Sequence, residues 1–295
     1  MRVVEDFASV RSLARGVVGL VPTMGFLHEG HLSLIGAAAA DTDTVVVSVF
    51  VNPLQFGEAS DLSSYPRDLD RDVALAESAG ADVVVAPGVE EMFPVAPETV
   101  VSVGSVAAPM EGLHRPGHFD GVATIVAKLF AGVGPDRAYF GRKDAQQLAV
   151  VRTMVRDLSF PIDVVGRPIV REHDGLALSS RNVRLSDADR LKAVTLSQGL
   201  MAGADLFESG DASVDEIIGA VRRRVSADVS VEYVEIAGSE TAAPASDLGG
   251  EQFLAIAGRI GDVRLIDNVT LDNGTRTVDR GTRLDGPSIL YEGGS

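Results

Sequence analysis

No cysteine occurs among the 295 residues of this chain. Its absence excludes a disulfide framework, a thiolate metal site and a cysteine nucleophile, and it fits a reducing compartment. Long apolar runs are also missing, because the longest, such as residues 45–51, have the length of a strand and not of a membrane span. The N-terminal segment has Glu5 and Asp6 where a secretory signal needs a basic start. We therefore expect a cytoplasmic protein that does not enter a membrane.

Positive charge is scarce. Lys and Arg number 26 against 42 Asp and Glu, for a formal net charge of −16, which disfavours binding to nucleic acid. The only lysines are Lys128, Lys143 and Lys192, and all five histidines lie between residues 28 and 173. An acidic chain that gathers its histidines and two of its three lysines in one segment fits a local anion site. Chance in an Arg-rich composition accounts for the same pattern.

Hydrophobic periodicity divides the chain into two parts. In the first 165 residues, apolar strand-like runs alternate with helix-like segments, which indicates a parallel sheet covered by helices on both faces. After about residue 170, two helices followed by three strands suggest a small α+β domain, and the last residues, GPSILYEGGS, are expected to be loosely held. The expected strands cover residues 17–23, 44–51, 81–86, 137–140, 162–165, 229–237, 253–257 and 263–268, and the expected helices cover 29–40, 66–79, 120–131, 144–158, 186–207 and 213–227.

The segment after the first apolar run contains two histidines three residues apart, His28 and His31, at an expected helix start. This spacing puts both on one helical face, beside unpaired backbone N–H groups and the positive end of the helix dipole, where phosphate binds favourably. Gly30 leaves room for a ligand, and Gly25 permits a tight turn. As alternatives, the two histidines cap the helix or ligate a metal.

Two further segments place cations where an anion could bind. Residues 140–144 form a strand-end turn with Arg142 and Lys143, and strand ends of a parallel sheet are where ligands bind. Residues 177–182 combine two hydroxyls with Arg181 on an expected mobile loop that could close over a polyphosphate. Alone, residues 140–144 would favour a solvated turn, and residues 177–182 are also consistent with an ordinary loop ahead of a helix. The patterns G-x-x-x-x-G-K-S/T and G-x-G-x-x-G after a strand are both absent.

Neutral amides mark a possible acid-binding site. Gln55 follows the second strand and Gln147 lies one turn into the helix that begins near residue 144; an amide binds hydroxyls and a carboxylate without adding charge, although either could be an ordinary surface residue. The Gly/Pro-rich segment 111–120 suits a lid or a rim. It also contains His114 and His118, but no third ligand stands at a metal-site spacing.

Six segments, taken in chain order, closely resemble the pantoate–β-alanine ligase family: PTMGFLHEGH, VFVNPLQFG, YPRDLDRD, EGLHRPGHFDGVATIVAKLF, YFGRKDAQQL and LSSRN. They are spread over residues 21–182, whereas H-x-G-H alone would indicate only the wider nucleotidylyltransferase-like superfamily. The resemblance implies an α/β fold with a Rossmann-like domain over residues 1–169, which would bind nucleotide and pantoate. It also implies a smaller α+β lid domain over residues 170–295 and a homodimer.

The resemblance further implies ATP-dependent joining of pantoate to β-alanine through a pantoyl adenylate, with release of AMP and pyrophosphate. His31, His28, Lys143 and Arg181 would be catalytic, with His31 assisting the departure of pyrophosphate. Gln55 would contact pantoate and β-alanine, and Gln147 would contact pantoate. The expected ATP contacts are Met24, Gly25, Phe26, Leu27, His28, Glu29, Gly30, His31, Gly141, Arg142, Lys143, Asp144, Val170, Leu178, Ser179, Ser180 and Arg181.

Two positions depart from the family pattern. Leu178 stands where the family usually has Met, a volume-conserving change of little cost. Some members of the family have paired acids after Y-P-R as a magnesium site, and here Arg71 interrupts that pattern within the segment 68–72. We therefore expect no metal ligands from the protein, and Mg²⁺ arriving on the ATP phosphates.

The ligase chemistry suits a chain without cysteine, because a carboxylate of the substrate attacks ATP directly and no enzyme nucleophile is required. Three other functions remain open at this point. A related nucleotidylyltransferase would transfer AMP to a phosphorylated substrate, a metal hydrolase would use the histidines without ATP, and a nucleotide sensor would bind ATP without turnover.

Overall fold

The computed structural model describes residues 1–57 and 62–291, which divide into two compact units. Unit 1 comprises residues 1–141 and 150–167, and unit 2 comprises residues 142–149 and 168–295. The change of unit after residue 167 lies close to the expected boundary at 169/170. The short segment 142–149 groups with the C-terminal unit instead of the N-terminal one.

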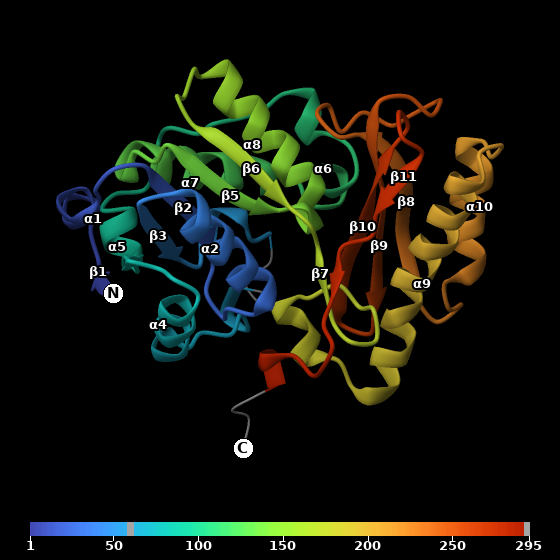
Figure 1. Cartoon of the computed structure of the whole chain (residues 1–295), viewed down its shortest axis with the longest axis horizontal. Coiled ribbons are helices and arrows are strands. Elements are labelled where there is room, and N and C mark those ends of the chain that lie inside the picture. The colour runs from blue at the N-terminus through green and yellow to red at the C-terminus, as the bar shows by residue number, and fades with distance from the viewer. Residues whose placement is uncertain (58–61, 292–295) are drawn as a thin grey trace. The chain divides into compact units, whose positions relative to one another are not determined.

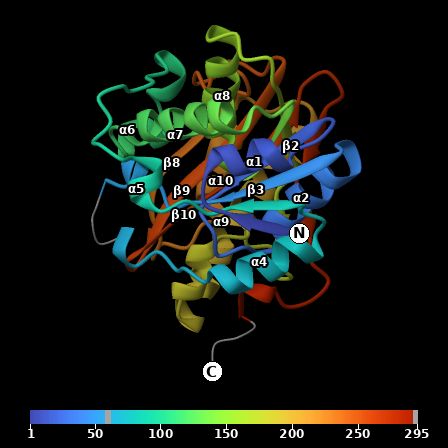
Figure 2. The same cartoon turned by 90° about the vertical axis from the view of Figure 1, so that its left-hand side faces the viewer.

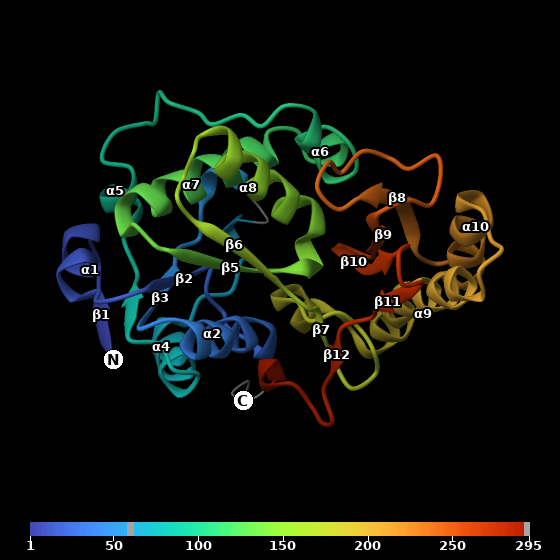
Figure 3. The ribbon, with the colours of Figure 1, turned by 45° about the horizontal axis from the view of Figure 1, so that its top comes forward.

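Unit 1 is built on a six-stranded parallel sheet in the order β1-β4-β3-β2-β5-β6. Helices α2 and α4 lie on one face of this sheet and α7 and α8 on the other (Figures 1 and 3). The strands are β1 (Arg2–Val4), β2 (Val18–Thr23), β3 (Thr44–Val49), β4 (Val83–Val85), β5 (Arg137–Gly141) and β6 (Asp163–Arg167). The helices are α1 (Phe7–Leu13), α2 (Glu29–Asp41), α4 (Leu69–Ser78), α5 (Val89–Met92), α6 (Glu111–His114) and α7 (His118–Val133), with 3₁₀ turns η1 (Pro53–Gln55) and η2 (Ser105–Ala107). The 3₁₀ turn η3 (Arg142–Asp144) and residues 145–149 of α8 (Ala145–Asp157) group with unit 2, whereas the rest of α8 belongs to unit 1.

The central strands are apolar on both faces because both faces are covered. Val45, Val46 and Val47 of β3 are at most 1% exposed, as expected for a parallel strand between two helical layers. Leu34 and Ile35 of α2 pack into the same core. Figure 2 shows α6 and α7 following one another beside this sheet.

Unit 2 consists of an antiparallel sheet in the order β11-β10-β9-β8 with α9 and α10 packed against it (Figure 1). The turn between β9 and β10 contains Gly261 at φ 55°, a left-handed conformation suited to glycine in a tight hairpin. A separate two-stranded parallel sheet pairs β7 with β12. The elements are β7 (Val170–Arg171), η4 (Ser180–Arg184), α9 (Asp187–Ser209), α10 (Val214–Arg224), β8 (Ser230–Gly238), β9 (Glu251–Ile260), β10 (Val263–Asp272), β11 (Thr277–Asp279), β12 (Thr282–Arg283) and η5 (Ile289–Tyr291).

The expected α/β fold, a parallel-sheet domain followed by a smaller α+β domain, is confirmed. The helix expected from residue 66 begins at Leu69, because the Asp68 side chain accepts the backbone N–H of Arg71 and caps the helix there. The expectation of a loosely held C-terminus is wrong for residues 288–291, since Ser288 and Leu290 are 1% and 5% exposed; residues 292–295 lie outside the described chain.

Candidate active site

Three groups of predicted site residues, 24–31, Gln55 and 141–144, follow the carboxyl ends of three neighbouring strands. Strands β2, β3 and β5 end at Thr23, Val49 and Gly141, and β2 lies between the other two. The chain proceeds outward from β2 through β3 and β4 on one side, and through β5 and β6 on the other. The boundary between β2 and β5 is therefore a topological switch point, where open parallel sheets bind ligands.

The loop after β2 holds a strained shape that a neighbouring helix stabilises. Gly25 and Phe26 have φ angles of 81° and 51°, in the left-handed region that non-glycine residues rarely adopt. Asp72 of α4 accepts the backbone N–H groups of Phe26 at 2.8 Å and Leu27 at 2.6 Å. A Cβ on Gly25 would lie 2.8 Å from Oδ2 of Asp72, so only glycine fits there. Arg71 adds a third hydrogen bond between α4 and this loop by donating to the Leu27 carbonyl at 2.8 Å.

Asp72 is 1% exposed, and its environment acts on the carboxyl in two directions. Burial raises the pKa of Asp72, while the N–H groups of Leu27 and Phe26 lower it in part. Both carboxylate oxygens are engaged by backbone donors. Asp72 thus supports the loop, a role that sequence reasoning missed, since the acids after Y-P-R were considered only as metal ligands.

The two histidines form a reciprocal cap at the start of α2. Nδ1 of His28 accepts the Gly30 N–H at 3.2 Å, and Nδ1 of His31 accepts the His28 N–H at 3.3 Å. The capping alternative considered from the sequence is therefore present. An Nδ1 that accepts a hydrogen bond has no proton, so each neutral ring is protonated at Nε2. The ring centroids lie 4.1 Å apart. As N-cap and N3 residues of α2, both histidines lie at the positive end of the helix dipole.

Gln55 is held beside the loop after β2. Asn52 donates from Nδ2 to Gln55 Oε1 at 3.0 Å, and Gln55 Nε2 lies 3.1 Å from the sulfur of Met24. Unit 1 thus brings an expected acid-binding residue next to an expected ATP-binding residue. His118 donates from Nδ1 to the Gln55 carbonyl at 2.9 Å, since a carbonyl only accepts. The turn η1 is therefore held through both the side chain and the main-chain carbonyl of Gln55.

The Gly/Pro-rich segment that suits a lid or a rim is partly helical. Residues 111–114 are helix α6, and His118 begins α7. Arg115 donates to the Gln55 carbonyl at 3.3 Å and pairs with Glu111 at 3.7 Å. In residues 1–57 and 62–291, no group of three or more His, Asp or Glu side chains has a metal-binding arrangement.

Unit 2 contains most of the remaining expected contacts. Arg142, Lys143, Asp144 and Gln147 are partly exposed, whereas the neighbouring Gln146 is only 4% exposed. Asn268 of β10 donates from Nδ2 to the carbonyls of Arg142 at 2.9 Å and Lys143 at 2.7 Å. No sequence pattern indicated this contact, because 125 residues separate Asn268 from Lys143.

The segment 178–181 differs from the expected loop. Ser179 caps the 3₁₀ turn η4 by accepting the Arg181 N–H at 3.3 Å. Leu178, Ser179 and Ser180 are buried, at 2%, 6% and 6% exposed, while Arg181 is partly exposed. The Leu178 N–H donates to the Val170 carbonyl at 3.0 Å, so unit 2 brings these two expected contacts together.

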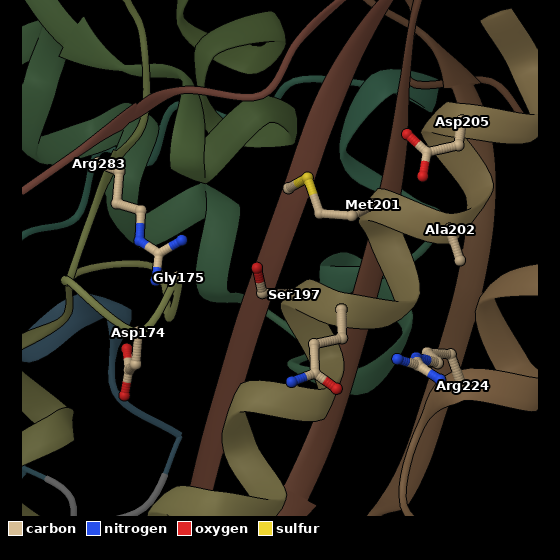
Figure 4. Close-up of a pocket in the computed structure, with 9 residues that line it drawn as sticks. Asp174, Gly175, Ser197, Met201, Ala202, Asp205, Arg224 and Arg283 are labelled. Atoms are coloured by element: carbon tan, nitrogen blue, oxygen red, sulfur yellow. The ribbon is translucent and has the colours of Figure 1, made fainter.

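A pocket of about 640 Å³ lies elsewhere in unit 2. Figure 4 shows Ser197, Met201 and Asp205 of α9 along it, with Asp174 and Arg283 from other segments. Its acids are already paired: Asp174 with Arg190 at 2.8 Å and Asp205 with Arg280 at 2.7 Å. None of the expected site residues lines this pocket.

None of the helices in the described chain is long and apolar enough to cross a membrane.

The chain matches known proteins over most of its length. A model of the pantoate-beta-alanine ligase family matches residues 2–270. The pantothenate synthetase of Acetivibrio thermocellus is 46% identical over 280 residues, covering 92% of this chain and 100% of that protein. The crystal structure of pantothenate synthetase from Thermus thermophilus is 52% identical, with a TM-score of 0.88 and coverage of 91% of this chain and 98% of that one.

A further solved relative has ligands. The pantoate-beta-alanine ligase of Francisella tularensis, described as complexed with β-γ ATP and β-alanine, is 32% identical with a TM-score of 0.73 and covers 91% of this chain and 97% of that one. Identity above 30% over nearly the full length, together with the family match over residues 2–270, confirms the resemblance found in the six sequence segments. This chain belongs to the pantoate–β-alanine ligase family.

Proposed function

We propose that this chain catalyses the ATP-dependent joining of pantoate to β-alanine through a pantoyl adenylate, as a step of pantothenate and coenzyme A biosynthesis. Membership of the ligase family and the relatives named pantothenate synthetase support this reaction. The main structural observation in its favour is that residues 24–31, Gln55 and 141–144 follow the carboxyl ends of β2, β3 and β5, at the switch point of the sheet.

The reaction has two steps whose atoms balance without an enzyme nucleophile. A carboxylate oxygen of pantoate attacks the α-phosphorus of ATP, and the bond from that phosphorus to the bridging oxygen breaks, so pyrophosphate leaves. The amine of β-alanine then attacks the carbonyl carbon of the pantoyl adenylate, AMP leaves and the amine loses a proton. The protein must hold the two anions in line and offset charge that develops on the leaving group.

Residues of both units take part in this proposal. In unit 1, residues 24–31 and Gly141 contact ATP, and His31, with its proton at Nε2, donates to the departing pyrophosphate while His28 and the N-terminus of α2 stabilise its charge. In unit 2, residues 142–144, Val170 and 178–181 contact ATP, with Lys143 and Arg181 as the charge-offsetting cations. Since Ser179 and Ser180 are buried, we expect their contribution to come chiefly from shaping the turn η4 that presents Arg181.

Gln55 binds pantoate and contacts β-alanine in this proposal, and Gln147 binds pantoate. The contact between Gln55 and Met24 supports the assignment, because it puts an acid-binding amide beside the nucleotide loop. A neutral amide there orients the pantoate carboxylate without lowering its negative charge, which the attack on phosphorus requires.

Mg²⁺ is proposed to arrive on the ATP phosphates. The acids after Y-P-R fit poorly as a ready metal cage, since Asp68 caps α4 and both oxygens of Asp72 accept backbone N–H groups. When bound, the cation offsets charge on the phosphates. The homodimer and the role of unit 2 as a lid are proposals from the family resemblance, and the cytoplasmic location stays a prediction from the sequence.

AMP formation tests the proposal directly. We expect ATP and Mg²⁺ with pantoate and β-alanine to yield AMP and pantothenate in equal amounts, dependent on both acids. AMP release that depends on a different acceptor would contradict the assigned substrates, and binding of ATP without turnover would indicate a sensor. A hydrolase would show activity without ATP.

Lys143→Ala tests the assigned cation. Removing a charge that acts on the transition state costs about 3–4 kcal/mol, or about 10²–10³-fold in kcat. The matched control is Lys128→Ala, whose ammonium lies 5.8 Å from the ring centroid of Phe93 and is not an expected ATP contact. Turnover of the Lys143 variant close to that of the wild type would remove Lys143 from the mechanism.

A further inference from the structure

The side-chain amide of Asn268 is buried in unit 2 and forms hydrogen bonds with the main chain at Lys143. It is 3% exposed, and Nδ2 donates to two successive carbonyls, those of Arg142 and Lys143. Its Oδ1 is buried and has no hydrogen-bond partner among the described residues. An unpartnered buried oxygen is destabilising, and an apolar residue would avoid that cost. The amide at this position is therefore explained by the two carbonyls that it holds.

Asn268 is itself fixed by charged neighbours. Arg171 of β7, 3% exposed, donates to the Asn268 carbonyl at 3.0 Å and pairs with Asp267 at 2.7 Å. The Asn268 N–H donates to the other oxygen of Asp267 at 2.7 Å. A buried pair with this many hydrogen bonds allows little movement, because breaking one partner leaves an uncompensated charge. These contacts thus fix β10, the strand that contains Asn268, to β7.

Glu172, the residue after Arg171 of β7, holds the turn η4, which contains Arg181. Glu172 is 0% exposed and accepts Nδ2 of Asn182 at 2.7 Å and a guanidinium nitrogen of Arg190 at 2.6 Å. Asn182 belongs to η4, the turn that contains Arg181, and it also donates to the Ala177 carbonyl at 3.0 Å. Arg171 and the adjacent Glu172 therefore anchor both the Lys143 turn and the Arg181 turn.

We propose that Asn268 is a positioning residue, which sets the main chain at Lys143 so that its ammonium and the guanidinium of Arg181 are presented to the ATP phosphates from one rigid frame. This inference rests on the proposed ligase function. The grouping of residues 142–149 with unit 2 supports it, because the Lys143 turn and η4 then belong to the same compact unit. Electrostatic stabilisation depends on such preorganisation, and a displacement of about 1 Å costs up to about 10²-fold in rate.

The test is Asn268→Ala in the full chain, with Asn273→Ala as the matched control. Asn273 has the same pattern just beyond the far end of β10: Nδ2 donates to the Gly250 carbonyl at 2.8 Å and to Gln252 Oε1 at 3.0 Å, and its Oδ1 is buried without a partner in the described chain. We expect N268A to lower kcat/KM for ATP by about 10- to 100-fold with little change in KM for β-alanine. N273A stays within about twofold of the wild type on the same reasoning, since its partners lie away from Lys143.

A double-mutant cycle separates positioning from general destabilisation. In a K143A background, measured in single turnovers with enzyme in excess of ATP, N268A has no further effect beyond about twofold, because the group that it positions is gone. An equal loss in both backgrounds, or a kcat/KM for ATP unchanged by N268A, would overturn the proposal. If N268A does not fold, Asn268→Asp takes its place, because Asp keeps the volume but removes the donor. The same results are then expected, and the same results would overturn the proposal. Absence of wild-type AMP formation from both acids would instead overturn the proposed function and this inference together.

Discussion

Gly121→Ala tests the link between helix packing and the Gln55 turn. Gly121 is a buried residue of α7, and a Cβ there would lie 2.2 Å from the carbonyl oxygen of Leu54 and 2.8 Å from the backbone nitrogen of Gln55. Both contacts are with main chain, which cannot rotate away as a flexible side chain would. The turn η1 must therefore retreat, although the Gly121 carbonyl still accepts from Asn52.

The magnitude follows from these distances. Ordinary contact begins at 3.4 Å, so the Leu54 carbonyl must move by about 1 Å, a displacement that can cost about 10²-fold in rate. Overpacking costs about 1–3 kcal/mol, and the better helix propensity of Ala returns about 1 kcal/mol. We expect kcat/KM for pantoate to fall about 100-fold while the free energy of unfolding falls by at most about 2 kcal/mol.

The assay is AMP formation at varied pantoate, together with urea unfolding. Gly36→Ala is the control, because Gly36 is an exposed residue of α2 whose added Cβ meets nothing within 4 Å. It should gain up to about 1 kcal/mol from helix propensity with unchanged kinetics. A Gly121 variant with wild-type kcat/KM for pantoate would refute the reasoning that the turn places Gln55 for catalysis.

Asp72→Ala removes the acceptor of two backbone N–H groups, each costing about 1–3 kcal/mol when left unsatisfied. We expect a loss of about 2–4 kcal/mol in urea unfolding and a raised KM for ATP; an unchanged KM for ATP would separate Asp72 from nucleotide binding. Tyr291→Phe removes a hydroxyl that donates to Glu172 at 3.0 Å and accepts from Arg190 at 2.6 Å, at a cost of about 1–3 kcal/mol at about pH 9. Burial, followed by the charge of Glu172, raises the pKa of Tyr291 from 10.0 to about 12. Between these two values the unfolded chain has released this proton while the folded chain retains it, so wild-type stability falls as the pH rises. The variant lacks this part of the fall, and urea unfolding at about pH 9 and about pH 11 should show a smaller difference between the two proteins at the higher pH.

Local chemistry explains how much of the fold was predictable. The run of residues 44–49 is rich in β-branched residues and almost continuously apolar, which indicates a strand buried on both faces. The histidine pair lies at the start of the helix expected from residue 29, and the reciprocal cap of His28 and His31 is found there. These features depend on residues within a few positions of each other, so a sequence displays them directly.

The sequence by itself determined the order of the longer strands and helices, the change from an α/β to an α+β pattern, and the six segments that identify the family. It did not indicate short elements such as β1, α1, α5 and β7. Only the tertiary structure decided that Asp72 clamps the loop after β2, that Asn268 grips the turn at Lys143 and that Ser288 and Leu290 are buried. Both contacts join residues that are far apart in the chain; Asp72 and Leu27, for example, are 45 positions apart. Strand pairing and packing set such distances, and no local propensity or spacing encodes them.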